Sequence, residues 1–216
     1  MIKAVLFDLD GTLLNTLTDL QVSVNTALKS VDAPVRSLEE IRAFVGDGAV
    51  KLCERALGDL KEPALTGRVL TAFRAHYADN MDVETAPYPG VIKLLIELKR
   101  TGIARAVVSN KYDAAVQKIC TRYFPDLIDI AVGEGNGMPP KPAPDSTLHA
   151  MESLAIASEE AIYVGDTDVD VMTATNAGLA CIGVTWGFRS RSVLERAGVA
   201  YIVDTADDLL KMIRGL

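Results

Sequence analysis

The 216-residue sequence is poor in the residues on which several common classes of protein depend. Its three cysteines form no C-x-x-C pair, which excludes zinc ribbons and thioredoxin-like redox chemistry. Its two histidines, His76 and His149, stand apart from any partner at a metal-ligand spacing. Scattered cysteines in odd number are typical of a reduced compartment, so we expect a cytoplasmic protein.

Long apolar runs and basic runs are also missing. No segment approaches the ~20 apolar residues that a membrane span needs, and the apolar run at the N-terminus is too short for a signal peptide. The 22 basic and 29 acidic residues give a net charge of -7, without a run of Lys and Arg. We therefore expect no nucleic-acid partner and no membrane partner. Overall acidity still permits a local site for an anion, and a monomer and a homodimer both stay open.

Three familiar catalytic or nucleotide-binding motifs do not occur. The sequence has no G-x-x-x-x-G-K-[ST], which excludes a P-loop, and Ser109 lacks the G-x-S-x-G setting of a serine hydrolase. Gly133, Gly135 and Gly137 alternate, but prolines rather than a helix follow them. A dinucleotide-binding fingerprint is therefore not expected.

What the sequence does contain is an alternation of short apolar runs and helical patterns. The runs predict buried strands at residues 4–7, 104–108, 128–132, 161–164, 180–184 and, more weakly, 201–203. Helical patterns lie between them at residues 91–100, 113–122, 146–154 and 169–176. This order predicts an α/β fold, a Rossmann-like parallel sheet with helices on both faces.

Residues 16–82 interrupt this alternation. They contain no convincing strand, yet apolar residues recur at helical spacing, for example at Leu20, Val24 and Leu28. The prolines at 87 and 89 prevent a helix from continuing and mark the return of the chain. We therefore predict a catalytic core of residues 1–15 and 83–216 and an inserted, all-helical cap domain of residues 16–82.

Polar side chains follow four of the predicted strands. In order along the chain they are Asp8, Asp10, Thr12, Ser109, Asn110, Lys141, Asp166 and Asp170. In open parallel sheets, ligands bind outside the carboxyl ends of the strands. We therefore expect these side chains to converge on one edge of the sheet.

The residue types at this edge suggest phosphoryl chemistry. Clustered carboxylates repel one another, and a hard divalent cation such as Mg²⁺ relieves that repulsion. Lys141 and the Ser109 hydroxyl would hold phosphate oxygens. Asp8 would act as a nucleophile, while Gly11 lets the chain turn so that Asp10 can protonate the leaving oxygen and later deprotonate water.

Simpler interpretations stay open for each residue alone. Asp8 and Asp10 could be solvated loop acids at a strand end. Asp166 could be a helix N-cap and Asp170 a first-turn acid favoured by the helix dipole. An EF-hand is excluded because Val171 stands where that loop requires glycine.

Taken together and in order, these segments resemble the four motifs of the haloacid dehalogenase superfamily: Asp8-Leu9-Asp10-Gly11-Thr12, Ser109, Lys141-Pro142 and Gly165-Asp166-x-x-x-Asp170. The resemblance covers essentially the whole chain and implies a helical cap after the first motif. It implies Asp8 as nucleophile and Asp10 as general acid and base. It also implies Mg²⁺ bound by Asp8, the Asp10 backbone carbonyl and Asp166, with Asp170 in support, and Thr12, Ser109, Asn110 and Lys141 contacting phosphate or holding the site together. A dehalogenase would lack the acid at position 10, which favours a phosphatase.

Within that superfamily, residues 45–57 are similar to the cap segment of phosphoglycolate phosphatases. Gly46 and Gly48 would expose backbone N–H groups at a helix start, where a substrate carboxylate could bind. The alternative is an ordinary N-cap formed by Asp47. Residues 185–188, Thr-Trp-Gly-Phe, are similar to a loop of the same group, whereas Asn15-Thr16 departs from the Asp-Ser that relatives commonly carry.

We therefore expect a magnesium-dependent phosphatase of a small phosphorylated metabolite, with 2-phosphoglycolate as the first substrate to test. The alternatives are a pyrophosphatase, a sugar-phosphate or nucleotide phosphatase, and a phosphoglucomutase-like isomerase. A binding protein without catalytic activity is the least favoured, because it has no need of both Asp8 and Asp10.

Overall fold

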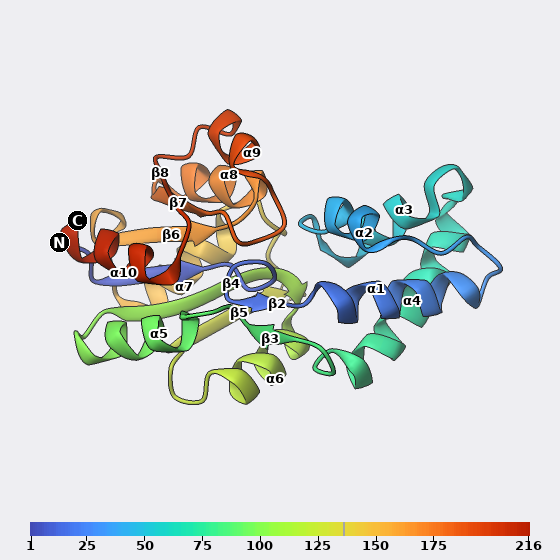
Figure 1. Ribbon diagram of the computed structural model, residues 1–216, viewed down its shortest axis with the longest axis horizontal. Helices are drawn as coiled ribbons and strands as arrows, with labels where there is room; N and C mark the ends of the chain where they lie inside the picture. The colour runs from blue at the N-terminus through green and yellow to red at the C-terminus, as the bar shows by residue number, and fades with distance from the viewer. Residues whose placement is uncertain (136) are drawn as a thin grey trace.

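The computed structural model describes residues 1–135 and 137–216 and contains one six-stranded parallel sheet (Figure 1). Its order is β5-β4-β1-β6-β7-β8, and every neighbouring pair is parallel. The strands are β1 (Ala4–Phe7), β4 (Ala104–Tyr112), β5 (Ile130–Glu134), β6 (Ala161–Gly165), β7 (Ala180–Val184) and β8 (Tyr201–Val203). β1 lies between β4 and β6, so the chain builds outward from it first to one side and then to the other. This reversal of strand order creates a crevice at the carboxyl end of β1, where ligands bind in such sheets.

Helices cover both faces of the sheet because the strands are apolar on both sides. Val5 and Phe7 point into one hydrophobic cluster, while Ala4 and Leu6 point into another on the opposite face. The first face is covered by α5 (Val91–Arg100), α6 (Asp113–Tyr123) and α10 (Ala206–Gly215). The second is covered by α7 (Asp145–Leu154), α8 (Asp168–Asn176) and α9 (Arg191–Arg196), and a short 3-10 helix, η2 (Ser158–Glu160), precedes β6.

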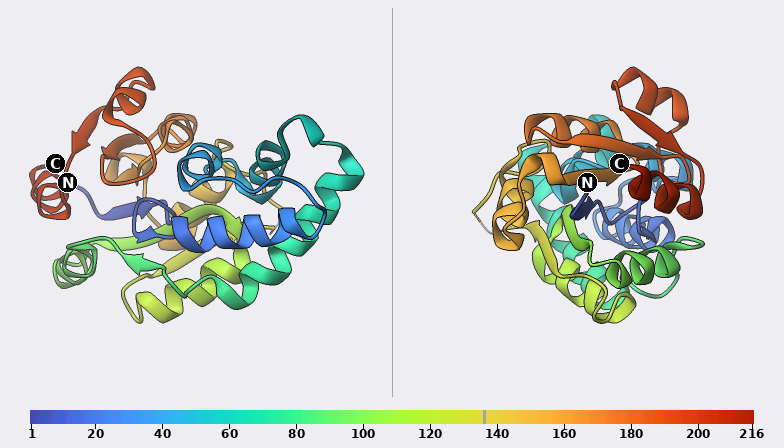
Figure 2. Two further views of the ribbon diagram at one scale, coloured as in Figure 1. Left: turned by 45° about the vertical axis from the view of Figure 1, so that its right-hand side comes forward. Right: turned by 90° about the vertical axis from the view of Figure 1, so that its left-hand side faces the viewer.

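The segment after β1 forms a helical cap beside the core (Figures 1 and 2). Its elements are α1 (Leu17–Lys29), α2 (Leu38–Phe44), α3 (Gly48–Leu57), the 3-10 helix η1 (Gly58–Leu60) and α4 (Pro63–Asn80). Figure 2 shows that the two chain termini lie together at the end of the core away from this cap. The cap therefore lies over the carboxyl ends of the parallel strands, which is the side on which such sheets bind ligands.

Two chain crossings join the core to the cap. At these crossings, β2 (Leu14–Asn15) and β3 (Ala86–Pro87) pair as a short antiparallel ribbon. The buried carboxylate of Asp19, on α1, accepts hydrogen bonds from the backbone N–H groups of Val83, Glu84 and Thr85. The chain segment that enters the cap and the segment that leaves it are thus linked to each other at the base of the cap.

The predicted fold class is confirmed, including the weak last strand and the position of each predicted helix. Two strands differ by more than one residue from their predicted bounds. β5 begins and ends two residues later than the predicted 128–132, and β4 continues to Tyr112, four residues beyond the predicted end at 108. Its register shifts between Val108 and Tyr112, after which Tyr112 pairs with Glu134. The extension carries Ser109, Asn110 and Lys111 above the sheet toward the cap. Among the described residues, we find no helix with the length and apolarity needed to cross a membrane.

Candidate active site

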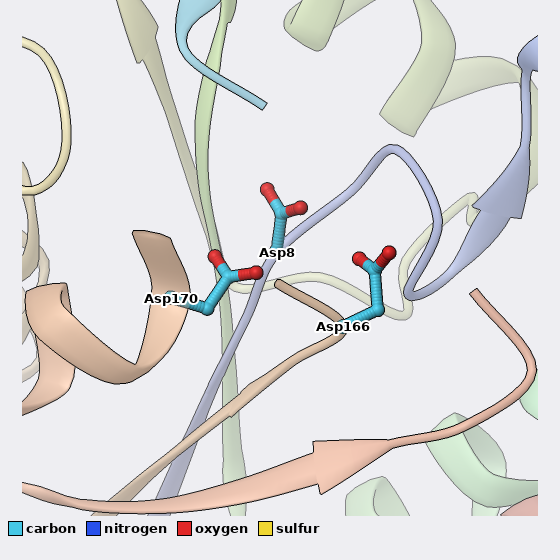
Figure 3. A group of neighbouring side chains, drawn as sticks. All are labelled: Asp8, Asp166 and Asp170. Carbon is cyan, nitrogen blue, oxygen red and sulfur yellow. The ribbon is translucent and has the colours of Figure 1, made fainter. Parts of the chain in front are cut away.

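Three buried carboxylates gather at the carboxyl ends of β1 and β6 (Figure 3). They belong to Asp8, Asp166 and Asp170, and one oxygen from each lies within 4.8 Å of those of the others. Asp8 directly follows β1, Asp166 directly follows β6, and Asp170 lies in the first turn of α8. The predicted convergence of these three side chains is therefore present in the structure.

Asp8 is held at the end of β1 by its backbone N–H, which donates to the Val164 carbonyl at 2.9 Å. One carboxylate oxygen, Oδ1, accepts a hydrogen bond from Lys141 Nζ at 2.8 Å. Among residues 1–135 and 137–216, no hydrogen bond reaches the other oxygen, Oδ2. Burial raises the pKa of Asp8 to about 7, helped by the charge of Asp170, although the Lys141 ammonium acts in the opposite direction.

Asp166 is enclosed by backbone that comes unusually close. Its oxygens accept hydrogen bonds from the Thr12 hydroxyl at 2.9 Å and from the Phe188 N–H at 2.7 Å. A Cβ atom at Gly11 or Gly187 would collide with the Asp166 side chain, so both positions require glycine. Burial, followed by the charges of Asp170 and Asp8, raises the pKa of Asp166 well above its ordinary value.

Asp170 is fixed by the start of α8. Its Oδ2 accepts hydrogen bonds from the N–H and the hydroxyl of Thr167, which is the N-cap residue of that helix. Its Oδ1 accepts from Lys141 Nζ at 2.7 Å. Thr167, rather than Asp166, is thus the N-cap, and the capping interpretation of Asp166 is wrong. Asp170 does cap the helix reciprocally, while it also contributes its second oxygen to the cluster.

Lys141 is the one cation in direct contact with this cluster among the described residues. Its three N–H groups are directed to Asp8, Asp170 and the Tyr163 hydroxyl, and its side chain is 3% exposed. Three ionised carboxylates beside one ammonium leave two negative charges uncompensated. The cluster therefore fits a divalent cation with oxygen ligands, which would match that charge and favour the ionised carboxylates.

Asp10 faces away from the cluster and toward the cap. Its two carboxylate oxygens accept hydrogen bonds from Lys111 Nζ at 2.8 and 3.0 Å. The same ammonium donates to the hydroxyl of Tyr77, on α4 of the cap, at 2.6 Å. The sequence pattern assigned no role in the site to Lys111, which directly follows the Ser109-Asn110 pair, or to Tyr77. It also assigned none to Tyr163, whose hydroxyl accepts from Lys141 at 3.1 Å.

A cavity of about 550 Å³ lies between the core and the cap, next to these carboxylates. Asp8, Asp10 and Lys111 are among the residues that line it. The predicted substrate-binding residues that also line it are Gly46, Gly48, Ser109 and Asn110. Apolar side chains from α1, α3 and α4, among them Leu20, Leu52 and Phe73, form much of the wall on the cap side.

Two predicted phosphate contacts, Thr12 and Lys141, do not line this cavity within the described part of the chain. Both lie behind the carboxylates and hydrogen bond to them. The side chain of Asn110 also serves the protein framework, because it binds both backbone groups of Lys141 and the Gly46 carbonyl. For these three residues the structure supports the expectation that they hold the site together; direct contact with phosphate stays a prediction.

At the start of α3, Asp47 occupies the N-cap position but makes no capping hydrogen bond through its side chain. It pairs instead with Arg55 at 2.6 Å. Gly46 and Gly48 have φ angles of 132° and 84°, which favour glycine. Asp47 therefore does not form the side-chain hydrogen bond of an ordinary N-cap. Gly46 and Gly48 line the cavity, as expected.

A family model described as haloacid dehalogenase-like hydrolase matches residues 5–184, most of the chain. The chain belongs to the haloacid dehalogenase-like hydrolases. This match includes all four predicted motifs, from Asp8 to Asp170.

Several curated relatives of this haloacid dehalogenase-like hydrolase are named phosphoglycolate phosphatase. It is 32% identical to the phosphoglycolate phosphatase of Colwellia psychrerythraea over 96% of this chain and 95% of that one. A solved structure from Lactobacillus delbrueckii subsp. bulgaricus matches with a TM-score of 0.94 and 35% identity, covering 98% of both chains. One from Haemophilus somnus, described as a predicted phosphoglycolate phosphatase, matches with a TM-score of 0.91 and 30% identity, covering 98% and 97%. Family and relatives together establish this hydrolase as a phosphatase.

Proposed function

We propose that this phosphatase hydrolyses a small phosphorylated metabolite, 2-phosphoglycolate being the best single candidate, through a phosphorylated Asp8. The observation that carries the proposal is the setting of the Asp8 carboxylate. Asp8 lines the cavity, its Oδ1 is held by Lys141, and its Oδ2 accepts no hydrogen bond from the described residues, so the carboxylate is oriented and one oxygen is left to react.

In the first half of the reaction, Asp8 Oδ2 attacks the phosphorus atom and forms an O–P bond. The bond between phosphorus and the leaving oxygen breaks, and its electron pair stays with that oxygen. Asp10, which lines the same cavity, supplies the proton that converts this oxygen into an alcohol.

In the second half, water attacks the phosphorus atom of the aspartyl phosphate. Asp10, now ionised, takes a proton from that water, and the bond between phosphorus and Asp8 breaks. Asp8 and the protonated Asp10 are thereby restored, so the proton lost in the first half returns in the second.

The carboxylates of Asp8 and Asp166 and the backbone carbonyl of Asp10 would hold Mg²⁺, with Asp170 in support. When bound, Mg²⁺ supplies positive charge against the phosphoryl oxygens and the carboxylate cluster. Lys141 alone provides one positive charge for three carboxylates, which supports the requirement for a divalent ion.

The choice of 2-phosphoglycolate rests on the relatives and on the start of α3. Relatives named phosphoglycolate phosphatase match over nearly the whole chain. Gly46 and Gly48 border the cavity at a helix start, where exposed N–H groups suit a substrate carboxylate. Other phosphate esters, pyrophosphate and a phosphoglucomutase-like isomerisation would use the same core with different contacts to the cap.

Two broader features belong to the same proposal. We assign residues 16–82 to the cap that closes over substrate, and residues 1–15 and 83–216 to the catalytic core. We also assign the protein to the cytoplasm, since Cys53, Cys120 and Cys181 are all buried and free, as is typical of a reducing compartment.

The decisive experiment is the substitution Asp8→Asn. The variant should fold, as judged by circular dichroism, and should lose phosphatase activity with Mg²⁺, because an amide oxygen does not replace the nucleophilic carboxylate. Near-normal activity of this variant would show that the proposed chemistry is wrong. Asp204→Asn, which alters an exposed carboxylate remote from the cavity, is the matched control.

A substrate panel tests the finer part of the proposal. Phosphate release from 2-phosphoglycolate, sugar phosphates, nucleotides and pyrophosphate should show the highest kcat/KM for 2-phosphoglycolate. Chelation should abolish turnover and added Mg²⁺ should restore it. Isomerisation of a sugar phosphate without phosphate release would favour the isomerase instead.

A further inference from the structure

Lys111 makes three hydrogen bonds that together cross from the core to the cap. Two of them reach the oxygens of Asp10 at 2.8 and 3.0 Å, and the third reaches the hydroxyl of Tyr77 at 2.6 Å. An ammonium has three N–H groups, so all of its donors are used. The Lys111 side chain is 5% exposed and that of Asp10 is 14% exposed, so the ion pair is largely shielded from water.

The partner on the cap is itself rigidly placed. Tyr77 lies on α4, is buried, and stacks on Phe73 with ring centroids 5.3 Å apart and planes 13° from parallel. Its hydroxyl accepts from Lys111 at 2.6 Å, and Tyr77 also lines the cavity. Burial by itself lowers the pKa of Lys111, but the charge of Asp10 together with Tyr77 and the hydrogen bonds to both outweighs it, so the lysine stays charged.

We propose that Lys111 and Tyr77 are positioning residues for Asp10, and that Tyr77 makes the acid–base step depend on a docked cap. This inference rests on the proposed function, because it assumes that Asp10 gives a proton to the leaving oxygen. Nothing in the haloacid dehalogenase motifs assigned above includes either residue.

The lysine fixes the orientation of the Asp10 carboxyl group, because it binds both of its oxygens. When Asp10 carries a proton, one oxygen still accepts from Lys111 and the other bears the proton. The carboxyl group is therefore held in one orientation instead of rotating about its bond to Cβ. Loss of the Tyr77 hydroxyl leaves one buried N–H of Lys111 without its acceptor, so the ammonium can reorient and release Asp10.

The dependence on the cap follows from the places of the three residues in the chain. Asp10 and Lys111 belong to the core, at the ends of β1 and β4, whereas Tyr77 belongs to α4. When the cap moves away, the Tyr77 hydroxyl moves with it and Lys111 loses one of its three acceptors. Proton transfer is then supported best when the cap is docked and water is excluded.

The test compares two substrates that differ in their need for a proton. The leaving group of 2-phosphoglycolate is an alkoxide, which needs a proton from the acid as it departs. The leaving group of p-nitrophenyl phosphate is a stable phenolate, which departs without one. Because kcat/KM reports the steps up to departure of the leaving group, we compare this constant for Tyr77→Phe and Lys111→Met. We expect a loss of about tenfold or more with 2-phosphoglycolate, part of the ~10²–10⁴ that an acid supplies. With p-nitrophenyl phosphate, we expect a change of less than about threefold on the same scale.

Tyr77→Phe keeps the ring and its stacking on Phe73, so it serves even where Lys111→Met does not fold. An equal loss with both substrates, or no loss with either, would overturn the inference, because a purely structural role does not distinguish leaving groups. Tyr123→Phe is the matched control, since it removes a hydroxyl that donates to the Thr85 carbonyl outside the cavity. This control should leave the ratio of the kcat/KM values for the two substrates unchanged.

Asp10→Asn separates this inference from the proposed function. This variant should lose more kcat/KM with 2-phosphoglycolate than with p-nitrophenyl phosphate, and the difference should be larger than for Tyr77→Phe or Lys111→Met. If Asp10→Asn shows this preference while Tyr77→Phe and Lys111→Met do not, only the positioning roles are wrong. If Asp10→Asn shows no preference, the proposed role of Asp10 is wrong and the inference falls with it.

Discussion

At the scale of single residues, two buried lysines divide the acidic groups of the site between them. Lys141 contacts Asp8 and Asp170, whereas Lys111 contacts Asp10. Within the described residues, Asp166 accepts from two neutral donors alone, a hydroxyl and a backbone N–H. The proposed nucleophile, Asp8, and the proposed acid, Asp10, thus have separate cations, which lets their positions be controlled independently.

Replacement of Lys141 by methionine should strongly destabilise the protein at pH 8 without Mg²⁺. Asp8 and Asp170 would remain buried without their cation, and such a loss typically costs about 3–5 kcal/mol. The cost should shrink at pH 5. The pKa of Asp8 already lies at about 7, and removal of the ammonium, which acts to lower it, raises it further, so acid protonates the carboxyl group. Urea denaturation at the two pH values measures both effects.

The exposed pair of Lys93 and Asp207 provides the control for this substitution. Its side chains are 67% and 62% exposed, so Lys93→Met should cost less than about 1 kcal/mol at either pH. A similar small cost for Lys141→Met would contradict our account of the buried charges.

The apparent affinity for Mg²⁺ should increase between pH 6 and pH 8. Protons compete with the ion for Asp8, whose pKa of about 7 means that the carboxyl group is mostly protonated at pH 6 and mostly ionised at pH 8. This single group accounts for about a tenfold change in the ionised fraction, and the raised pKa of Asp166 acts in the same direction. Thermal unfolding at graded Mg²⁺ concentrations gives the midpoint, and a midpoint independent of pH would contradict the proposed ligand role of Asp8.

At the scale of secondary structure, periodicity predicted the core well because both faces of its sheet are buried. Strands such as β1 and β6 consist of continuous apolar runs that stop at an acid or a glycine, which marks their ends in the sequence. β4 was predicted too short because its last residues, Ser109 to Tyr112, are polar or amphipathic. They stay extended through tertiary contacts, the pairing of Tyr112 with Glu134 and the bonds of Asn110 and Lys111.

The same reasoning explains which site residues the sequence revealed. Asp8, Asp166 and Asp170 follow strand ends and could be predicted from local order alone. Lys111 was missed because its partners, Asp10 and Tyr77, lie 101 and 34 residues away, and no local pattern encodes such contacts. Tyr77 itself has the spacing of an ordinary core residue of α4.

The link between α1 and the returning chain should be sensitive to Asp19→Asn. The Asp19 carboxylate accepts from three consecutive backbone N–H groups and from the Thr85 hydroxyl, which also lies in this segment. An asparagine offers one acceptor oxygen and turns an NH₂ group toward donors, so we expect a loss of about 2–3 kcal/mol. Denaturant unfolding gives this value, and hydrogen exchange should increase at residues 83–85. Asp79→Asn, at an exposed position on α4, should change neither.

At the scale of the whole molecule, the cap docks on the core through few direct polar contacts around the cavity. Asn110 binds the Gly46 carbonyl, Lys118 binds the Ala78 carbonyl, and Lys111 binds Tyr77. Arg189 adds hydrogen bonds to the carbonyls of Arg42 and Val45 at 2.7 and 2.6 Å. Most of these contacts use backbone carbonyls of the cap, so they depend on its position rather than on its side chains.

Arg189 acts where the dipole of α2 favours a cation. The last carbonyls of a helix have no partner within it, and a guanidinium with several fixed donors can bind more than one of them. Its side chain is 16% exposed, so water competes only in part for these bonds. Removing them should therefore favour positions of the cap away from the core.

The substitution Arg189→Met should raise KM while leaving kcat nearly unchanged, because the cavity is complete only when the cap is docked. If the lost bonds shift the equilibrium by about 1.4 kcal/mol, KM should rise by up to about tenfold, since apparent affinity falls with the fraction of docked molecules and the full effect requires that most free molecules are undocked. Small-angle X-ray scattering of the substrate-free variant should give a larger radius of gyration, and excess substrate should reduce it. Arg191→Met is the control two residues away, as its exposed pair with Asp204 lies within the core. A variant with unchanged KM and radius would mean that Arg189 does not hold the cap, and docking would then rest on the Asn110, Lys118 and Tyr77 contacts.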